Sequence, residues 1–182
     1  MGKVVVLGGN ARSGKSTLAY ELQKYGFNRI SFDILHSYFE NGLNIKFDDL
    51  PKEQKFNFFE TVVNEAINEA NNENINIVID MYDYLPSDIV KLKNKDKIEV
   101  YFLAYPNCDV DEIKYNVVHY AKPTDWIAQV NKEYLNECAK RFYNRNKILV
   151  EECNKYNMRL VDTKSGNKRQ EILSEILNEI VV

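Results

Sequence analysis

The sequence predicts an α/β fold, a three-layer αβα sandwich in which helices cover both faces of a parallel sheet. Short apolar runs alternate with helical segments along the whole chain, and no linker, internal repeat or low-complexity block interrupts them. A glycine-rich loop, G-N-A-R-S-G-K-S, separates the first apolar run from the first helical segment. One domain covering residues 1–182 is expected for a chain of this length.

Five short apolar runs, several of them rich in β-branched residues, are predicted as strands. They cover residues 3–8, 28–32, 75–80, 98–104 and 159–161. The second, third and fifth runs lead into Asp33, Asp80 and Asp162. Ligands of open parallel sheets bind beyond the carboxyl ends of the strands, so these acidic residues are expected at the ligand-binding edge.

Helical patterns fill the intervals between the strands. They cover residues 13–25, a short stretch ending at 39, and then 51–72, 86–92, 109–120, 127–156 and 168–181. Gly26 is a suitable stop for the first helix, and Asn41-Gly42 is expected to close the second. Pro51 suits the first position of the third helix, whose apolar residues recur at spacings of three and four.

Composition excludes some classes of protein. The net charge is −3, whereas proteins that wrap nucleic acid or lie on membrane surfaces usually carry a basic excess. No apolar run approaches the roughly 18 residues that a membrane-spanning helix needs. The three cysteines fit no metal or redox motif, and we expect reduced thiols in a cytoplasmic protein without a signal peptide. A monomer and a homodimer are both compatible with the sequence.

The glycine-rich loop matches the pattern G-x-x-x-x-G-K-[ST] in its required context of strand, loop and helix. Its backbone amides and the following helix N-terminus form a cradle for phosphate. The lysine supplies a full positive charge, and the hydroxyl after it is a ligand for Mg²⁺. The predicted nucleotide-binding residues are Gly9, Asn10, Ala11, Arg12, Ser13, Gly14, Lys15, Ser16 and Thr17.

Two carboxylates beside such a loop suit phosphoryl transfer. Asp80 ends an apolar strand, as in the Walker B pattern, and is predicted with Ser16 to hold the metal. Asp33 is predicted to hold the acceptor hydroxyl or to take its proton. A helix cap is the structural alternative for both residues, and Asp162 is expected to be a turn former.

Arginine is scarce in this chain, so its positions are informative. Arg141 and Arg145 lie four residues apart on a predicted helix and are candidates to clamp the transferring phosphate. Arg169 is a weaker candidate for contact with the base. Near the ligand-binding edge, Phe39 and Tyr82 are candidates to stack on a flat substrate. His36 and His119 match no metal or triad spacing and are expected to be surface or cap residues.

On these motifs the sequence resembles the P-loop kinase superfamily, which includes adenylate kinase, shikimate kinase, polynucleotide kinase and the zeta toxins. The resemblance rests on G-G-N-A-R-S-G-K-S-T at residues 8–17, S-F-D at 31–33, I-V-I-D at 77–80, the pair Arg141 and Arg145, and L-V-D-T at 160–163. It implies a sheet in the order 2-3-1-4-5, an acceptor-covering segment at about 34–74 and an arginine-bearing lid at about 121–146. It also implies Mg²⁺ and ATP.

The predicted function is therefore transfer of the γ-phosphoryl group of Mg-ATP to a small-molecule acceptor. Lysines at 46, 52 and 55 are the only basic residues between Arg29 and Asp80, which favours a neutral hydroxyl over a nucleoside monophosphate. The nucleoside monophosphate remains the alternative acceptor. A switch protein or ATPase without an acceptor is the alternative of another class, although no guanine-reading N-K-x-D is present: Asn94-Lys95-Asp96-Lys97 has its aspartate one place early.

Overall fold

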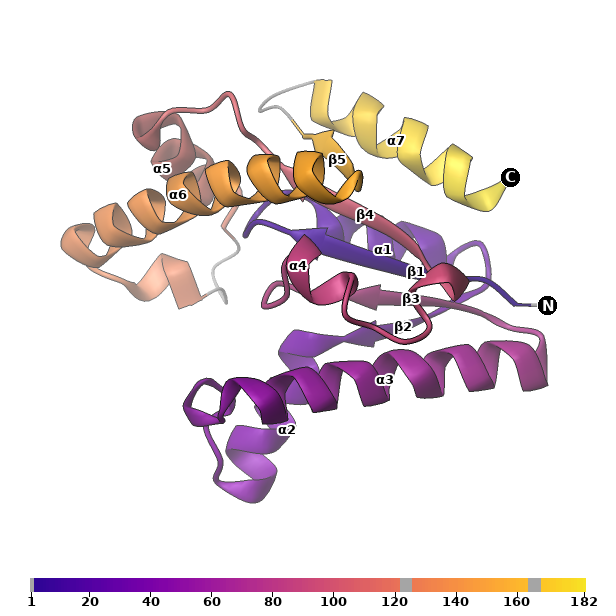
Figure 1. Cartoon of the computed structure of the whole chain (residues 1–182). Helices are drawn as coiled ribbons and strands as arrows, with labels where there is room; N and C mark the ends of the chain where they lie inside the picture. Colours follow the sequence, from indigo (N-terminus) through magenta and orange to yellow (C-terminus); the bar gives the residue numbers. More distant parts are fainter. Residues whose placement is uncertain (1, 122–125, 164–167) are drawn as a thin grey trace.

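The computed structural model describes residues 2–121, 126–163 and 168–182. At its centre lies a five-stranded sheet in the order β2-β3-β1-β4-β5, in which every neighbouring pair is parallel. The strands are β1 (Val4–Gly9), β2 (Phe27–Ser31), β3 (Asn76–Asp80), β4 (Glu99–Ala104) and β5 (Arg159–Asp162). The predicted fold class and strand order are confirmed (Figure 1).

Helices cover both faces of the sheet. They are α1 (Lys15–Gln23), α2 (Phe32–Leu43), α3 (Lys52–Glu73), α4 (Pro86–Ile89), α5 (Val110–His119), α6 (Lys132–Tyr156) and α7 (Lys168–Val181), with 3₁₀ turns η1 (Phe47–Asp49), η2 (Lys95–Lys97) and η3 (Trp126–Gln129). Apolar residues of α1 and α7 pack on one face, and those of α3, α4 and the second half of α6 pack on the other. A third cluster joins α5 to the first half of α6. The sandwich thus has a core on each side of the sheet.

The second strand and second helix differ from the predicted bounds. β2 ends at Ser31, and the fully buried Phe32 begins α2 instead of ending the strand. The helix runs through Asn41-Gly42 to Leu43, because the left-handed residue that ends it is Asn44, with a φ of 55°. Asp33 lies in the first turn of α2, and Ser31 occupies the N-cap position.

The long helix before β5 begins later than predicted. Asn131 caps α6, and its side chain accepts a hydrogen bond from the Tyr134 amide at 2.8 Å. Residues 126–129 form the separate turn η3. Part of the predicted lid, residues 122–125, lies outside the described residues. The described part of that segment includes η3 and the first half of α6, which lie beyond the carboxyl ends of the strands, at the left of Figure 1.

Candidate active site

The loop between β1 and α1 packs tightly against β4. Gly9 has a φ of 127°, and a Cβ at this position would lie 2.0 Å from the carbonyl oxygen of Leu103. Gly14, with a φ of 99°, occupies the N-cap of α1 in the left-handed region. Only glycine suits these two positions. The resulting bend brings the loop amides and the N-terminus of α1 to the same place, which favours an anion there.

Lys15 lies at the base of this loop, with 7% of the residue exposed. Its Nζ donates to the carbonyl oxygen of Asn10 at 2.6 Å. Burial lowers the pKa of Lys15 to about 8, and the negative charges of Asp80 and Asp33 oppose that shift. A phosphate bound in the loop would supply a full counter-charge and offset the desolvation of this ammonium.

Asn10 has a role that the sequence did not reveal. Its buried side chain donates to the carbonyl oxygen of Phe142 and to Oδ1 of Asn146, both at 2.7 Å. The Asn146 side chain in turn donates to the carbonyl oxygen of Tyr105 at 3.1 Å. This buried amide pair joins the loop to α6 and to the end of β4. An asparagine within the apolar stripe of the predicted 127–156 helix was the available signal.

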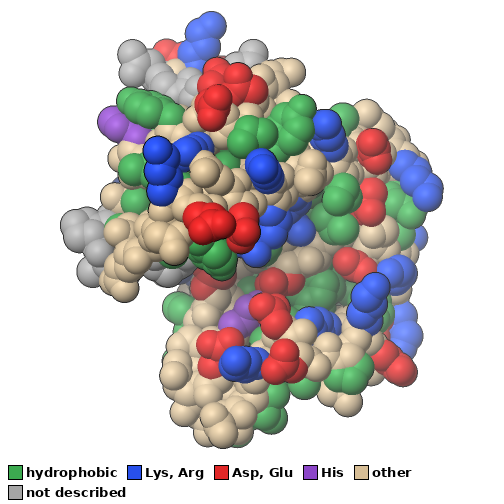
Figure 2. Space-filling view, turned by 90° about the vertical axis from the view of Figure 1, so that its left-hand side faces the viewer, with side chains coloured by type: hydrophobic (Ala, Val, Ile, Leu, Met, Phe, Trp, Pro, Cys, Tyr) green, Lys and Arg blue, Asp and Glu red, His purple; other side chains and the backbone are tan. Residues whose placement is uncertain are grey.

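A cavity of about 640 Å³ opens beside the loop at the carboxyl ends of the strands. Figure 2 looks onto this edge and shows a hollow between the part of the molecule with α5 and α6, above, and the part with α2, below. Most of the predicted site residues line the cavity. These are Ala11, Arg12, Gly14, Lys15, Ser16, Thr17, Asp33, Asp80, Tyr82 and Arg141.

The other predicted residues lie outside the lining of this cavity. Gly9 and Ser13 shape the loop, and the Ser13 hydroxyl donates to the carbonyl oxygen of Asn10 at 2.8 Å. Phe39 belongs to an aromatic cluster beneath α2, where its ring meets Phe47 and Phe58 edge-on. It is placed in the core and not against the cavity, because its position in α2 faces η1 and α3.

Asp80 forms a buried ion pair with Arg29. The Nη2 of Arg29 lies 2.6 Å from Oδ2 of Asp80, and the two side chains are 9% and 5% exposed. The guanidinium also lies over the Tyr20 ring, 4.4 Å from its centroid. The sequence analysis gave Arg29 no role, although an arginine inside a short buried strand was a signal. Arg29 fixes one carboxylate oxygen of Asp80 and balances its charge.

Asp83 lines the same cavity and was also missed. Burial raises its pKa, while the nearby His36 and Arg145 oppose that shift. Nε2 of His36 lies 3.5 Å from Oδ2 of Asp83, and the imidazole stacks on Phe47 at 3.9 Å. The spacing D-x-x-D after the third strand was the signal in the sequence. His36 thus lies behind the cavity wall, against Asp83.

The two arginines of α6 have different surroundings. Arg141 lines the cavity, with its guanidinium 5.5 Å from the Phe142 ring centroid. Arg145 donates to the carbonyl oxygen of Tyr82 and lies over the Tyr82 ring at 4.1 Å. Burial lowers the pKa of Arg145, and it is not part of the cavity lining. The geometry therefore brings Arg141 to the cavity and holds Arg145 behind Tyr82.

Arg169 closes the opposite side of the cavity. It donates to the carbonyl oxygen of Arg12, and its guanidinium lies over the Tyr120 ring at 5.4 Å. Burial lowers the pKa of Arg169. Gln170 and Leu173 of α7 line the cavity beside it. A planar group bound next to the loop would contact this side of the cavity. The sequence predicted Arg169 as a weaker candidate for contact with the nucleotide base.

Solved structures with this fold are known. A shikimate kinase from Acinetobacter baumannii in complex with shikimate matches with a TM-score of 0.56 and 15% identity over 100% of this chain and 94% of that chain. The fold is that of the P-loop kinases. A Sinorhizobium meliloti gluconokinase matches at 0.57 with 15% identity, covering 98% and 95% of the two chains. A Campylobacter jejuni dephospho-CoA kinase matches at 0.57 with 13% identity, covering 100% and 98%.

No protein-family model matches the chain, and no curated protein sequence does. The likeness to the P-loop kinases therefore rests on the fold. The arrangement of the site has to be judged from the residues of this chain.

The donors present fit magnesium. Within the described ranges, no cluster of three or more His, Cys, Asp or Glu side chains could enclose a metal ion. Ser16 and Asp80 do line the same cavity beside the loop. Magnesium is usually held by one or two carboxylates together with waters and substrate phosphates, and it rarely uses an all-protein cage. One hydroxyl and one carboxylate next to a phosphate loop are such a donor set.

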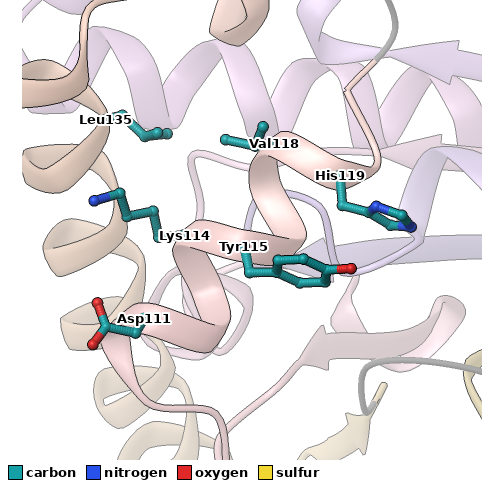
Figure 3. A pocket seen from close by; sticks show the side chains of 6 residues that line it. All are labelled: Asp111, Lys114, Tyr115, Val118, His119 and Leu135. Carbon is teal, nitrogen blue, oxygen red and sulfur yellow. The ribbon is translucent and has the colours of Figure 1, made fainter.

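A second hollow of about 400 Å³ lies on α5 and α6 (Figure 3). Its lining includes Asp111, Lys114 and Leu135, and the rings of Tyr115 and His119 stack at 5.2 Å. No residue of the phosphate loop or of the strand ends lines it. This hollow is separate from the candidate active site.

In the parts of the chain that the structure covers, no helix is long and apolar enough to cross a bilayer.

Proposed function

We propose that this protein is a kinase that transfers the γ-phosphoryl group of Mg-ATP to a hydroxyl of a small molecule. The observation that carries the proposal is the meeting of three groups in one cavity. These are the Lys15 loop, the carboxylates Asp33 from the start of α2 and Asp80 from the end of β3, and Arg141 from α6. A phosphate-binding loop, a metal donor, a proton acceptor and an arginine that neutralises charge are parts that recur in phosphoryl transfer.

Each group has a role in the proposed reaction. Lys15 and the loop amides bind the phosphates, and Arg141 stabilises the negative charge that develops on the transferring phosphoryl group. Ser16 and Asp80, with phosphate oxygens, would hold magnesium, which supplies further charge neutralisation when bound. The acceptor oxygen attacks the γ-phosphorus, the bond to the ADP oxygen breaks, and Asp33 receives the hydroxyl proton.

Arg145 has a positioning role in this proposal. Its guanidinium holds Tyr82 by its carbonyl and by its ring, so it supports the wall of the cavity from behind. The segment of residues 34–74 and the described part of 121–146 flank the cavity from below and above, and we propose that they cover the acceptor and the phosphates. Closure over the site would exclude water and so favour transfer over hydrolysis.

A nucleoside monophosphate is the weaker candidate acceptor. Its phosphate would need a cation on the β2–β3 side, where the described lining residues are the carboxylates together with Tyr20, Met81 and Tyr82. The test is ADP release from Mg-ATP with a panel of hydroxyl compounds. Acceptor-dependent release supports a kinase, and equal release with and without every acceptor would indicate an ATPase. Failure to bind Mg-ATP would refute both functions.

A further inference from the structure

The cavity beside the phosphate loop has two halves of opposite charge. Its basic side chains come from the loop, α6 and α7, and they are Arg12, Lys15, Arg141 and Arg169. Its acidic side chains come from α2 and from the end of β3 and the turn after it, and they are Asp33, Asp80 and Asp83. Phosphates belong with the first group. The acidic half is left for the acceptor.

The arginines nearest to the acidic half are already engaged. Arg29 is paired with Asp80 at 2.6 Å, and Arg145 is bound to the carbonyl and ring of Tyr82. Neither arginine lines the cavity. Among the described residues, Asp33 and Asp83 form no ion pair with lysine or arginine, although the charge of Arg145 acts on Asp83, and the imidazole of His36 lies 3.5 Å from Asp83. Two carboxylates of this half therefore lack a guanidinium partner.

Lys15 is a cation of the cavity whose charge interacts with all three of these carboxylates. Its ammonium lies 5.9 Å from the centroid of the Tyr82 ring. The charges of Asp80, Asp33 and Asp83 all favour its protonated form. When the phosphates of ATP bind this ammonium, its charge no longer offsets the charges of Asp33 and Asp83, whereas Asp80 keeps its partner Arg29. A second cation in the acidic half would restore the balance.

We propose that the acceptor of this kinase is a polyhydroxy compound that carries an ammonium group. Asp83 binds the ammonium, and Asp33 receives the proton of the hydroxyl that attacks the γ-phosphorus. His36, stacked on Phe47 and 3.5 Å from Asp83, holds that carboxylate in place. This inference rests on the proposed kinase function and adds the charge of the substrate. An acidic acceptor such as shikimate or gluconate would instead meet like charges.

The test uses three open-chain six-carbon compounds that differ at one carbon: glucamine with an ammonium, glucitol with a hydroxyl, and gluconate with a carboxylate. The shift in melting temperature is measured for the full chain loaded with magnesium and a non-hydrolysable ATP analogue, and ADP release is measured with ATP. Glucamine is expected to bind at least ~10-fold more tightly than glucitol, because a charge-assisted hydrogen bond is stronger than a neutral one. Gluconate is expected to bind most weakly.

Asp83→Asn should bring the affinities for glucamine and glucitol within ~3-fold of each other, because the amide keeps the shape and removes the charge. Asp111→Asn, an exposed acid on α5, is the matched control and should preserve the preference. The inference is overturned if the wild-type protein binds glucitol or gluconate as tightly as it binds glucamine. It is also overturned if none of the three compounds binds. In that case the kinase function stands if the ATP analogue raises the melting temperature, and it fails if the analogue does not bind.

Discussion

At the scale of single residues, Lys15 combines function with a cost in stability. It is buried as an ammonium with a pKa lowered to about 8, from a usual value of 10.5. Below pH 8 the folded protein therefore carries a desolvated charge that the unfolded chain hydrates. Between about pH 8 and 10.5 the unfolded chain binds more protons at this residue than the folded protein does. The cost is full at neutral pH and fades as the pH rises through that window.

Lys15→Met should therefore stabilise the protein while it removes phosphate binding. At pH 7 the free energy of unfolding is expected to rise by up to about 3 kcal/mol, and the gain should shrink at pH 10. Urea unfolding of both proteins at the two pH values measures the difference. Lys24→Met, on an exposed side chain, is the control. A variant less stable than the wild type at pH 7 would show that Lys15 contributes packing or hydrogen bonding that outweighs its desolvation.

The pair of Arg29 and Asp80 makes the opposite prediction. Arg29→Met leaves a buried carboxylate without its partner, which should lower the free energy of unfolding by about 3–5 kcal/mol. The double variant Arg29→Met, Asp80→Asn removes both charges and should recover part of that loss. Chemical denaturation of the wild type, of Arg29→Met, of Asp80→Asn and of the double variant gives the coupling energy. Additive effects of the two substitutions would mean that the pair is not coupled.

At the scale of elements, much of the architecture follows from sequence patterns. The apolar runs predicted the five strands, most clearly the central strands β1, β3 and β4, which are largely buried on both faces of the parallel sheet. The glycine-rich loop predicted the strand β1 before it and the helix α1 after it, because the motif requires both. The position of Asp33 was less predictable: Ser31 and Asp33 both suit a helix N-cap, and the burial of Phe32 decided where β2 ends and α2 begins.

Residues that act through tertiary contacts were harder to find. Asn10 satisfies the loop motif whatever its side chain does, so its bond to Asn146 could not be read from the motif. Arg141 and Arg145 lie four residues apart on one helix, so the sequence did not distinguish them. Their surroundings differ because Arg145 packs on Tyr82, whereas Arg141 lines the cavity. The neighbour of His36 could not be identified from the sequence, because Asp83 lies far along the chain, in the connection that follows β3.

The amide pair that joins the loop to α6 should position Arg141. Asn146→Leu removes one partner and leaves the buried amide of Asn10 partly unsatisfied, so a loss of about 1–3 kcal/mol in stability is expected. If the pair aligns α6, the turnover number should fall at least ~10-fold while the affinity for ATP changes by less than ~3-fold.

Asn144→Leu, at an exposed position on the same helix, should change neither quantity. Steady-state kinetics with a productive acceptor and calorimetry with ATP separate the two effects. Loss of ATP affinity alone would show that the pair shapes the phosphate loop and not the position of Arg141.

At the scale of the whole molecule, the strand order gathers groups that are far apart in the sequence. β1 lies at the centre of the sheet, so its loop has the carboxylates that follow β2 and end β3 on one side and the arginine of α7 on the other. Helix α6 crosses above these strand ends in Figure 1 and brings Arg141 to the same cavity. The proposed phosphate half and acceptor half follow from this order.

Mg-ATP should stabilise the whole domain, because a ligand that binds only the folded state adds RT ln(1 + [L]/Kd) to the free energy of unfolding. A concentration 100-fold above Kd gives about 2.7 kcal/mol, enough for a rise of about 5 °C or more in the melting temperature of a chain of this size. Thermal unfolding with ATP, with magnesium alone and with both provides the comparison. A melting temperature that is the same in all three would contradict nucleotide binding.

The central claim is that the loop at residues 9–16 holds the phosphates of Mg-ATP. Calorimetric titration of Mg-ATP into the wild-type protein and into Lys15→Ala tests it most directly. We predict saturable binding of one nucleotide per chain to the wild type and a loss of at least ~100-fold in affinity in the variant. No heat of binding to the wild type at millimolar nucleotide, or equal affinity in both proteins, would contradict the claim.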